Sequence, residues 1–153
     1  MRTQIDISHE DHQGHTTLMC AALNGDTKTI KSLLMHGADA NASDEEGRTA
    51  LMFAAINLHQ DAVKALLEHG AEVNARARDG CTALMLAASS GDAEIVQMLL
   101  DYGADINGSF ILTGQTATTL AAERGHLAII ELLESVSIQN QIATNDEVRR
   151  AAA

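Results

Sequence analysis

The chain has 153 residues, a length typical of one domain. Hydrophobic residues make up 46% and charged residues 20%, a composition that excludes a disordered chain and requires a packed core. Because aromatic residues contribute only 2%, we expect Ala, Leu, Ile, Val and Met to build that core. The formal net charge of −11 argues against nucleic acid and anionic membranes as partners, and it favours a basic or neutral protein.

The sequence carries no sign of a membrane span or an export signal. No segment approaches the roughly 18 consecutive apolar residues of a spanning helix, and residues 1–11 are mixed and acidic. Two cysteines are too few for a disulfide framework and suit a reducing compartment. We therefore expect a cytoplasmic protein.

Two phrases recur in register along the chain. The first opens on a glycine, has threonine two residues later and ends in Ala-Ala, and it begins at Gly14, Gly47, Gly80 and Gly114. The first three of these glycines are 33 residues apart and the fourth follows after 34. The second phrase, Gly-Ala-Asp/Glu-x-Asn, follows a leucine pair and begins at Gly37, Gly70 and Gly103. A fixed period of this length indicates a repeat architecture.

Each repeat predicts the same elements in the same order. A first helix begins after a threonine whose hydroxyl can accept a hydrogen bond from a first-turn N–H: Thr16, Thr49, Thr82 and Thr116. A second helix follows with one apolar face, and in the first three repeats a glycine in the left-handed conformation ends it: Gly37, Gly70 and Gly103. The polar, turn-rich segment after that glycine is typical of a projecting hairpin. The repeats predicted in this way are about 11–43, 44–76, 77–109 and 110–135.

Beyond residue 135 the repeat signal fades. We expect residues 136–153 to form a polar tail with a short helix at Asn145–Ala153. Polar residues replace core residues at both ends of the array, as at Thr29, Ser32 and Glu134, so we expect a complete array with capping repeats.

These phrases resemble the ankyrin-repeat family, whose signature is G-x-T-P-L-H-x-A-A, a second helix ending in leucines, and G-A-D-V-N. The resemblance covers about residues 5–135 and implies an all-α solenoid of four helix-turn-helix units with short β-hairpin loops, in one domain at 1–135. Where the family usually has His, this chain has Met19, Met52, Met85 and Thr119. We therefore expect inter-repeat hydrogen bonding through that His to be lost.

The resemblance also implies a function, because the concave groove of such solenoids usually binds a protein. We expect a non-enzymatic adaptor, scaffold or regulatory subunit that needs no cofactor. The groove positions differ from repeat to repeat, which shows that stacking does not dictate them. The corresponding partner-binding residues are His12, Gln13, His15, Leu23, Asn24, Glu45, Glu46, Arg48, Ile56, Asn57, Arg78, Asp79, Cys81, Ser89, Ser90, Phe110, Leu112, Gln115, Glu123 and Arg124.

Two features of the surface have alternative interpretations. The acidic excess lies mainly in residues 44–109, where it serves either solubility or the steering of a basic partner. The extra residue before the fourth repeat falls in a hairpin with three consecutive apolar residues, Phe110-Ile111-Leu112. This triplet is either a contact surface or a cover for the fourth repeat.

The remaining candidates for chemistry are histidines and cysteines. His9, His12 and His15 are the only group that resembles a metal site, but their spacing in a hairpin does not bring the rings together, so we expect no metal. A metal- or ligand-responsive sensor at this hairpin is the alternative function. We expect His36, His59, His69 and His126 near helix ends, Cys20 in the core, and Cys81 near the groove. No nucleophile with a base and no phosphate loop is recognisable in the sequence.

Overall fold

The computed structural model describes residues 10–152, which form eight helices in four pairs. The first helices of the pairs are α1 (Thr17–Asn24), α3 (Ala50–Ile56), α5 (Ala83–Ser90) and α7 (Ala117–Glu123). The second helices are α2 (Thr27–Met35), α4 (Gln60–Glu68), α6 (Ala93–Asp101) and α8 (Leu127–Ala151). The predicted helix-turn-helix repeats are therefore confirmed.

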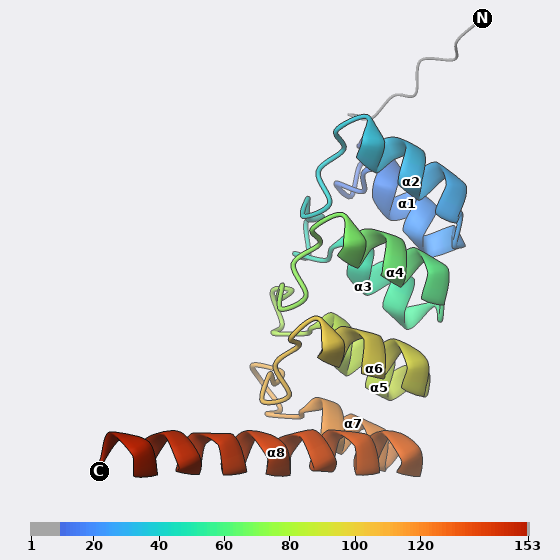
Figure 1. Ribbon diagram of the computed structural model, residues 1–153. Helices are drawn as coiled ribbons and strands as arrows, with labels where there is room; N and C mark the ends of the chain where they lie inside the picture. The colour runs from blue at the N-terminus through green and yellow to red at the C-terminus, as the bar shows by residue number, and fades with distance from the viewer. Residues whose placement is uncertain (1–9, 153) are drawn as a thin grey trace, which may run out of the picture.

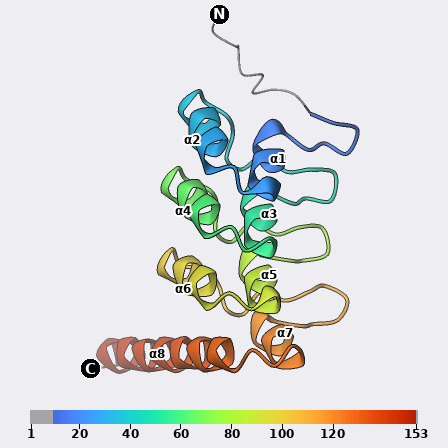
Figure 2. The ribbon, with the colours of Figure 1, turned by 90° about the vertical axis from the view of Figure 1, so that its right-hand side faces the viewer.

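The helices form two layers. Each first helix packs on the first helix of the next repeat, and each second helix does the same in the other layer. Figure 1 shows the pairs stacked in one direction, and Figure 2 shows loops projecting from the layer of first helices. The result is an open, all-α solenoid without a closed centre.

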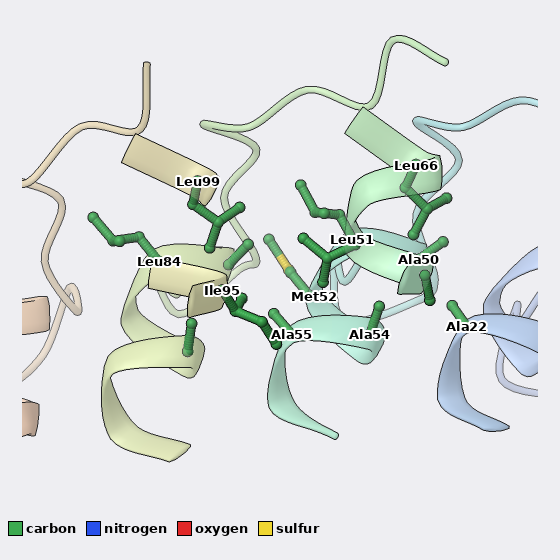
Figure 3. Close-up of a cluster of buried hydrophobic side chains, with 14 of the residues drawn as sticks. Ala22, Ala50, Leu51, Met52, Ala54, Ala55, Leu66, Leu84, Ile95 and Leu99 are labelled. Carbon is green, nitrogen blue, oxygen red and sulfur yellow. The ribbon is translucent and has the colours of Figure 1, made fainter. Parts of the chain in front are cut away.

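The core runs through the stack because each of the first three repeats contributes a buried alanine pair, the fourth contributes Ala121, and all four add large aliphatic side chains. Ala54 and Ala55 are fully buried on α3, and small side chains there allow neighbouring helices to approach closely. Leu66 and Leu99 are fully buried on second helices, each a contribution of about 1.5–3 kcal/mol. In Figure 3 side chains from consecutive repeats meet in one cluster. The aliphatic core expected from the composition is confirmed.

Most of the predicted threonine caps are present. The hydroxyls of Thr16, Thr82 and Thr116 accept hydrogen bonds from the backbone N–H of the residue three positions later. Thr49 precedes α3 but makes no capping bond, and its buried hydroxyl has no hydrogen-bond partner among the described residues. Thr49 thus occupies the predicted N-cap position, but the hydrogen bond expected from its hydroxyl is absent.

The hairpins are narrow and contact each other along the stack. Isolated antiparallel bridges join Glu10 to Thr16, Ser43 to Thr49 and Ser109 to Thr116. One backbone bond connects each hairpin to the next: the N–H of Glu45, Arg78 and Ile111 donates to the carbonyl of Gln13, Glu46 and Asp79, respectively. The loops therefore form a continuous row beside the first helices.

The last helix is longer than expected. α8 runs without interruption to Ala151, so residues 145–151 are helical as predicted but form the end of α8 rather than a separate short helix. The earlier second helices end at glycines with positive φ, Gly37, Gly70 and Gly103. Ser137 occupies the corresponding position of α8, and it lacks the preference for the left-handed conformation that ends a helix. Residues 138–152 are exposed, and α8 extends beyond the stack (Figure 1).

With 25 residues, α8 has the length of a membrane-spanning helix. Neither this helix nor any other within residues 10–152 has the apolar stretch that crossing a bilayer requires.

Candidate partner-binding groove

Figure 2 shows the row of hairpins beside the layer of first helices, and the predicted groove positions lie on these two sets of elements. The groove contains a hollow of about 350 Å³ where the second, third and fourth repeats meet. The hollow is lined by hairpin and first-helix residues: Glu46, Arg48, Met52, Phe53, Ile56, Ala77, Asp79, Cys81, Leu86 and Phe110. We call this feature the hollow below.

The hollow exists because the third repeat carries small side chains where the second carries larger polar ones. Ala77 lies 33 residues after Asp44, and Cys81 lies 33 residues after Arg48. Asp44 and Arg48 fill their own hairpin with an ion pair, in which Arg48 Nε lies 2.7 Å from Asp44 Oδ2. Ala77 and Cys81 cannot form such a pair, so the space beside the third hairpin stays open.

Asp44 is a buried carboxylate whose hydrogen bonds come from its own hairpin, and His15 Nε2 of the preceding repeat lies 3.3 Å from its Oδ2. Its Oδ1 accepts hydrogen bonds from the backbone N–H of Glu46 and Arg48, and its Oδ2 accepts one from the Arg48 guanidinium. Burial alone would raise the pKa of Asp44, but these bonds, those from Arg48 foremost, hold it below its ordinary value. Asp44 is therefore charged at neutral pH and fixes Arg48 in place.

Phe53 forms one wall of the hollow, and two polar side chains hold its ring. The guanidinium carbon of Arg48 lies 5.1 Å from the centre of the Phe53 ring. The His15 ring meets Phe53 edge-on, with centroids 5.4 Å apart and an angle of 87° between the planes. His15 is in turn hydrogen-bonded to Asp11, 3.0 Å away. The wall is therefore preorganised across two repeats.

The chemistry of the hollow is an apolar interior with an acidic edge. The Cys81 thiol is buried, and this burial, with a further effect of the Asp79 carboxylate, raises the pKa of Cys81 to about 11. The thiol is thus neutral at physiological pH and behaves as an apolar wall. Glu46 and Asp79 are exposed, and neither forms an ion pair with another described residue.

The structure brings some of the predicted groove residues together at the hollow and leaves others outside it. Those at the hollow are Glu46, Arg48, Ile56, Asp79, Cys81 and Phe110. Outside it are His12, Gln13, His15, Leu23, Asn24, Glu45, Asn57, Arg78, Ser89, Ser90, Leu112, Gln115, Glu123 and Arg124.

Several residues of the second set have structural partners. The side-chain amides of Asn24 and Asn57 donate to carbonyls of their own helices. Ser90 Oγ donates to the carbonyl of Ile56 in the preceding repeat, and Gln115 Nε2 donates to Glu123 Oε1. These contacts stabilise helix ends and the groove wall.

The three apolar residues of the fourth hairpin, Phe110-Ile111-Leu112, differ in their burial, which bears on whether they cover the fourth repeat or form a contact surface. Phe110 is half-buried, packs against the core and lines the hollow. Ile111 and Leu112 are exposed, with 67% and 94% of their surface accessible. Phe110 thus covers the junction between repeats, whereas its two neighbours face solvent.

Cys20 is exposed, so the prediction that it lies in the core is wrong. Its position corresponds to Phe53 and Leu86 in the next repeats, which are half-buried at the groove. Residues at this position face the groove rather than the stacked helices. The Cys20 side chain is smaller than those of Phe53 and Leu86, and neighbouring residues do not cover it.

Four residues of the hollow were not among the predicted groove positions: Met52, Phe53, Ala77 and Leu86. The sequence contains a signal for Phe53 and Leu86. Their position is occupied by Cys20 in the first repeat and by Leu120 in the fourth, so it varies from repeat to repeat as the predicted groove positions do. Ala77 gives no such signal, because a small residue in the sequence does not by itself indicate that the space beside it stays open.

No group of three or more His, Cys, Asp or Glu side chains within residues 10–152 is arranged to hold a metal ion. His12 is exposed, and His15 contacts Asp11 and Phe53. His9, the third histidine of the predicted cluster, lies outside the described residues.

Comparison with known families agrees with this geometry. The model of a family described as ankyrin repeats (3 copies) matches residues 2–77 and 74–145, which together are most of the chain. No curated protein matches the chain. With its stacked helix pairs, hairpins and matching sequence, the chain belongs to the ankyrin-repeat family.

Proposed function

We propose that this chain binds a protein partner in the groove and acts as a non-enzymatic adaptor, scaffold or regulatory subunit in the cytoplasm. Ankyrin repeats are generally protein–protein interaction modules. The observation that carries the proposal is the apolar hollow in the groove, since apolar pockets in an interface are where partners place their strongest contacts.

The charge of the molecule favours a basic partner. The net charge is −11, and the edge of the hollow carries the carboxylates of Glu46 and Asp79, which have no ion-pair partner among the described residues. An acidic field accelerates encounter with a basic protein, and the effect weakens as salt is added. The partner should therefore associate faster at low ionic strength.

Photo-crosslinking from inside and outside the groove tests this function. A photoreactive amino acid replaces Ile56, which lines the hollow, or Lys64, an exposed residue on α4 in the other layer. In cell extract we expect a partner protein to be crosslinked from position 56, and we expect that protein not to be crosslinked from position 64. Equal crosslinking from both positions, or none from position 56, contradicts a groove-binding function.

A pull-down with the double variant Ile56→Ser, Phe110→Ser provides a second measurement. We expect the variant to lose the partners that the unmodified protein recovers. Circular dichroism serves as the control for folding, because Phe110 also packs against the core. Recovery of the same partners by the folded variant would show that the groove assignment is wrong.

A further inference from the structure

We propose that the hollow is an anchor site for one large apolar side chain of a partner segment that carries Lys or Arg beside that side chain. This inference rests on the proposed function and specifies the chemistry of the partner. It is carried by the size and lining of the hollow, by the charges at its edge, and by the way its wall is held.

The size and lining of the hollow select an apolar side chain. Its volume of about 350 Å³ is near the small end of the ~300–1,000 Å³ range of ligand pockets, so it accommodates a side chain rather than a helix. Met52, Phe53, Leu86 and Phe110 supply apolar surface. The neutral Cys81 thiol adds no charge to the interior.

The charges at the edge select a cation next to the apolar side chain. Among the described residues Arg48 is the one cation that lines the hollow, and Asp44 already neutralises it through a 2.7 Å contact. The carboxylates of Glu46 and Asp79 have no such counter-ion within residues 10–152. A Lys or Arg beside the anchor would supply the missing charge, and it would make the charges of the two surfaces complementary.

The hollow is also preorganised for binding. Phe53 is fixed between Arg48 and His15, and Asp44 fixes Arg48. A rigid wall loses little conformational entropy when a partner binds. Little of the favourable free energy of the apolar contact is therefore offset, and most of it contributes to the affinity. The hollow also differs from the neighbouring cavities of the described chain, since those near the groove and on α8 are smaller or lined mainly by polar groups.

Random peptides displayed on phage provide the probe, with selection on the unmodified protein. We expect the selected peptides to share a large apolar residue beside Lys or Arg. The binding of one selected peptide, labelled with a fluorophore, is then measured by fluorescence anisotropy for each variant below.

The first variant fills the hollow with the side chains that the second repeat already uses. Ala77→Asp with Cys81→Arg would reproduce the Asp44–Arg48 pair in the third hairpin, so the variant should fold, and circular dichroism checks this. We expect peptide binding at least about tenfold weaker, as for loss of a central contact. The smaller change Leu86→Phe reduces the volume without new charge and should weaken binding in the same direction.

The second variant tests the cation. Glu46→Gln with Asp79→Asn removes two charges and leaves a side-chain oxygen at position 79 to accept the Cys81 N–H. Glu68→Gln with Glu94→Gln, on exposed positions of α4 and α6, gives a control with the same net charge. We expect several-fold weaker binding for the first pair only, and a smaller dependence on salt.

Three outcomes would overturn the anchor site: selected peptides without the expected pair of residues, no selected peptide that binds the filled variant more weakly, or equal losses for both charge pairs. If a small apolar molecule binds the hollow and no selected peptide does, the hollow is a small-molecule site instead. If the filled variant retains the partner crosslinked from position 56, the groove function stands and only the anchor site fails.

Discussion

The ring nitrogen Nε2 of His59 lies 3.1 Å from the carbonyl oxygen of Leu23 in the preceding repeat. His126 makes the same contact with the carbonyl of Ser89, also at 3.1 Å. Both histidines directly precede a second helix, where the other repeats have Asp26 and Asp92. Both aspartates accept bonds from their own helices, and Asp92 also accepts one from Gln60 Nε2 of the preceding repeat. The two histidines instead contact a backbone carbonyl of the preceding repeat. Histidine thus still joins repeats in this chain, at a position different from that of the family signature.

Replacing His59 with Ala should lower the free energy of unfolding by about 1 kcal/mol, because one inter-repeat hydrogen bond is lost and the Leu23 carbonyl is left to solvent. Urea denaturation at neutral pH measures the change. His12→Ala, at an exposed hairpin position, is the matched control and should leave stability unchanged. Equal effects of the two substitutions would show that the bond contributes nothing to stacking.

A second set of inter-repeat bonds comes from asparagines after the second helices. Asn41 Nδ2 donates to the Gly70 carbonyl at 3.1 Å, and its Oδ1 accepts from the Glu72 N–H at 2.7 Å. Asn74 makes the same two bonds to the next loop, at 3.0 and 2.8 Å. Asn107 holds the corresponding place in the third repeat, but α8 continues as a helix where the next loop would be.

This difference predicts unequal effects of the same substitution. Asn41→Ala and Asn74→Ala each remove two hydrogen bonds and should destabilise the protein by about 1–2 kcal/mol. Asn107→Ala should change the unfolding free energy by less than about 0.5 kcal/mol. Thermal unfolding of the three variants compares them directly. A loss for Asn107→Ala as large as for Asn74→Ala would contradict this account.

The repeats could be predicted from the sequence because their determinants are local and recur. Gly37 and Thr16 each have a conformational or hydrogen-bonding preference that acts within a few residues of the chain. The hollow could not be predicted in this way, since it depends on Ala77 being small beside Phe53 and Phe110 from other repeats. The continuation of α8 depended on one residue, Ser137, at a place where the repeat signal had already faded.

Leu58 has φ of +62°, in the left-handed region, where the corresponding residues of the other repeats are Gly25, Gly91 and Gly125. A side chain there costs about 1–2 kcal/mol. Leu58→Gly should therefore raise the unfolding free energy, by up to about 1 kcal/mol after the greater entropy of glycine in the unfolded chain is included. The opposite change, Gly91→Ala, should destabilise, because the new Cβ would lie 2.5 Å from the His126 ring. Differential scanning calorimetry measures both, and a lower melting temperature for Leu58→Gly would contradict the assignment of strain.

Acid should weaken the fold through Asp44, whose pKa is lower in the folded chain than the ~3.9 of an unfolded aspartate. A carboxyl of this kind stabilises the fold fully above its unfolded pKa, and the stabilisation is lost as the pH falls towards its folded pKa. We expect a constant unfolding free energy between about pH 5 and 7 and a decline below about pH 4. The exposed carboxylates of Asp11 and Asp26, whose pKa values hydrogen bonds also lower, contribute to the same decline.

Asp44→Asn separates the contribution of the buried carboxylate from the others. The variant loses the charge that pairs with Arg48, so its unfolding free energy at pH 7 should be lower by about 1–3 kcal/mol. Its decline in acid should be shallower, because only Asp11, Asp26 and the remaining acids still titrate. The two stability curves should therefore converge as the pH falls. Parallel curves between pH 7 and pH 3, measured by urea denaturation, would show that Asp44 is not the group whose protonation weakens the fold.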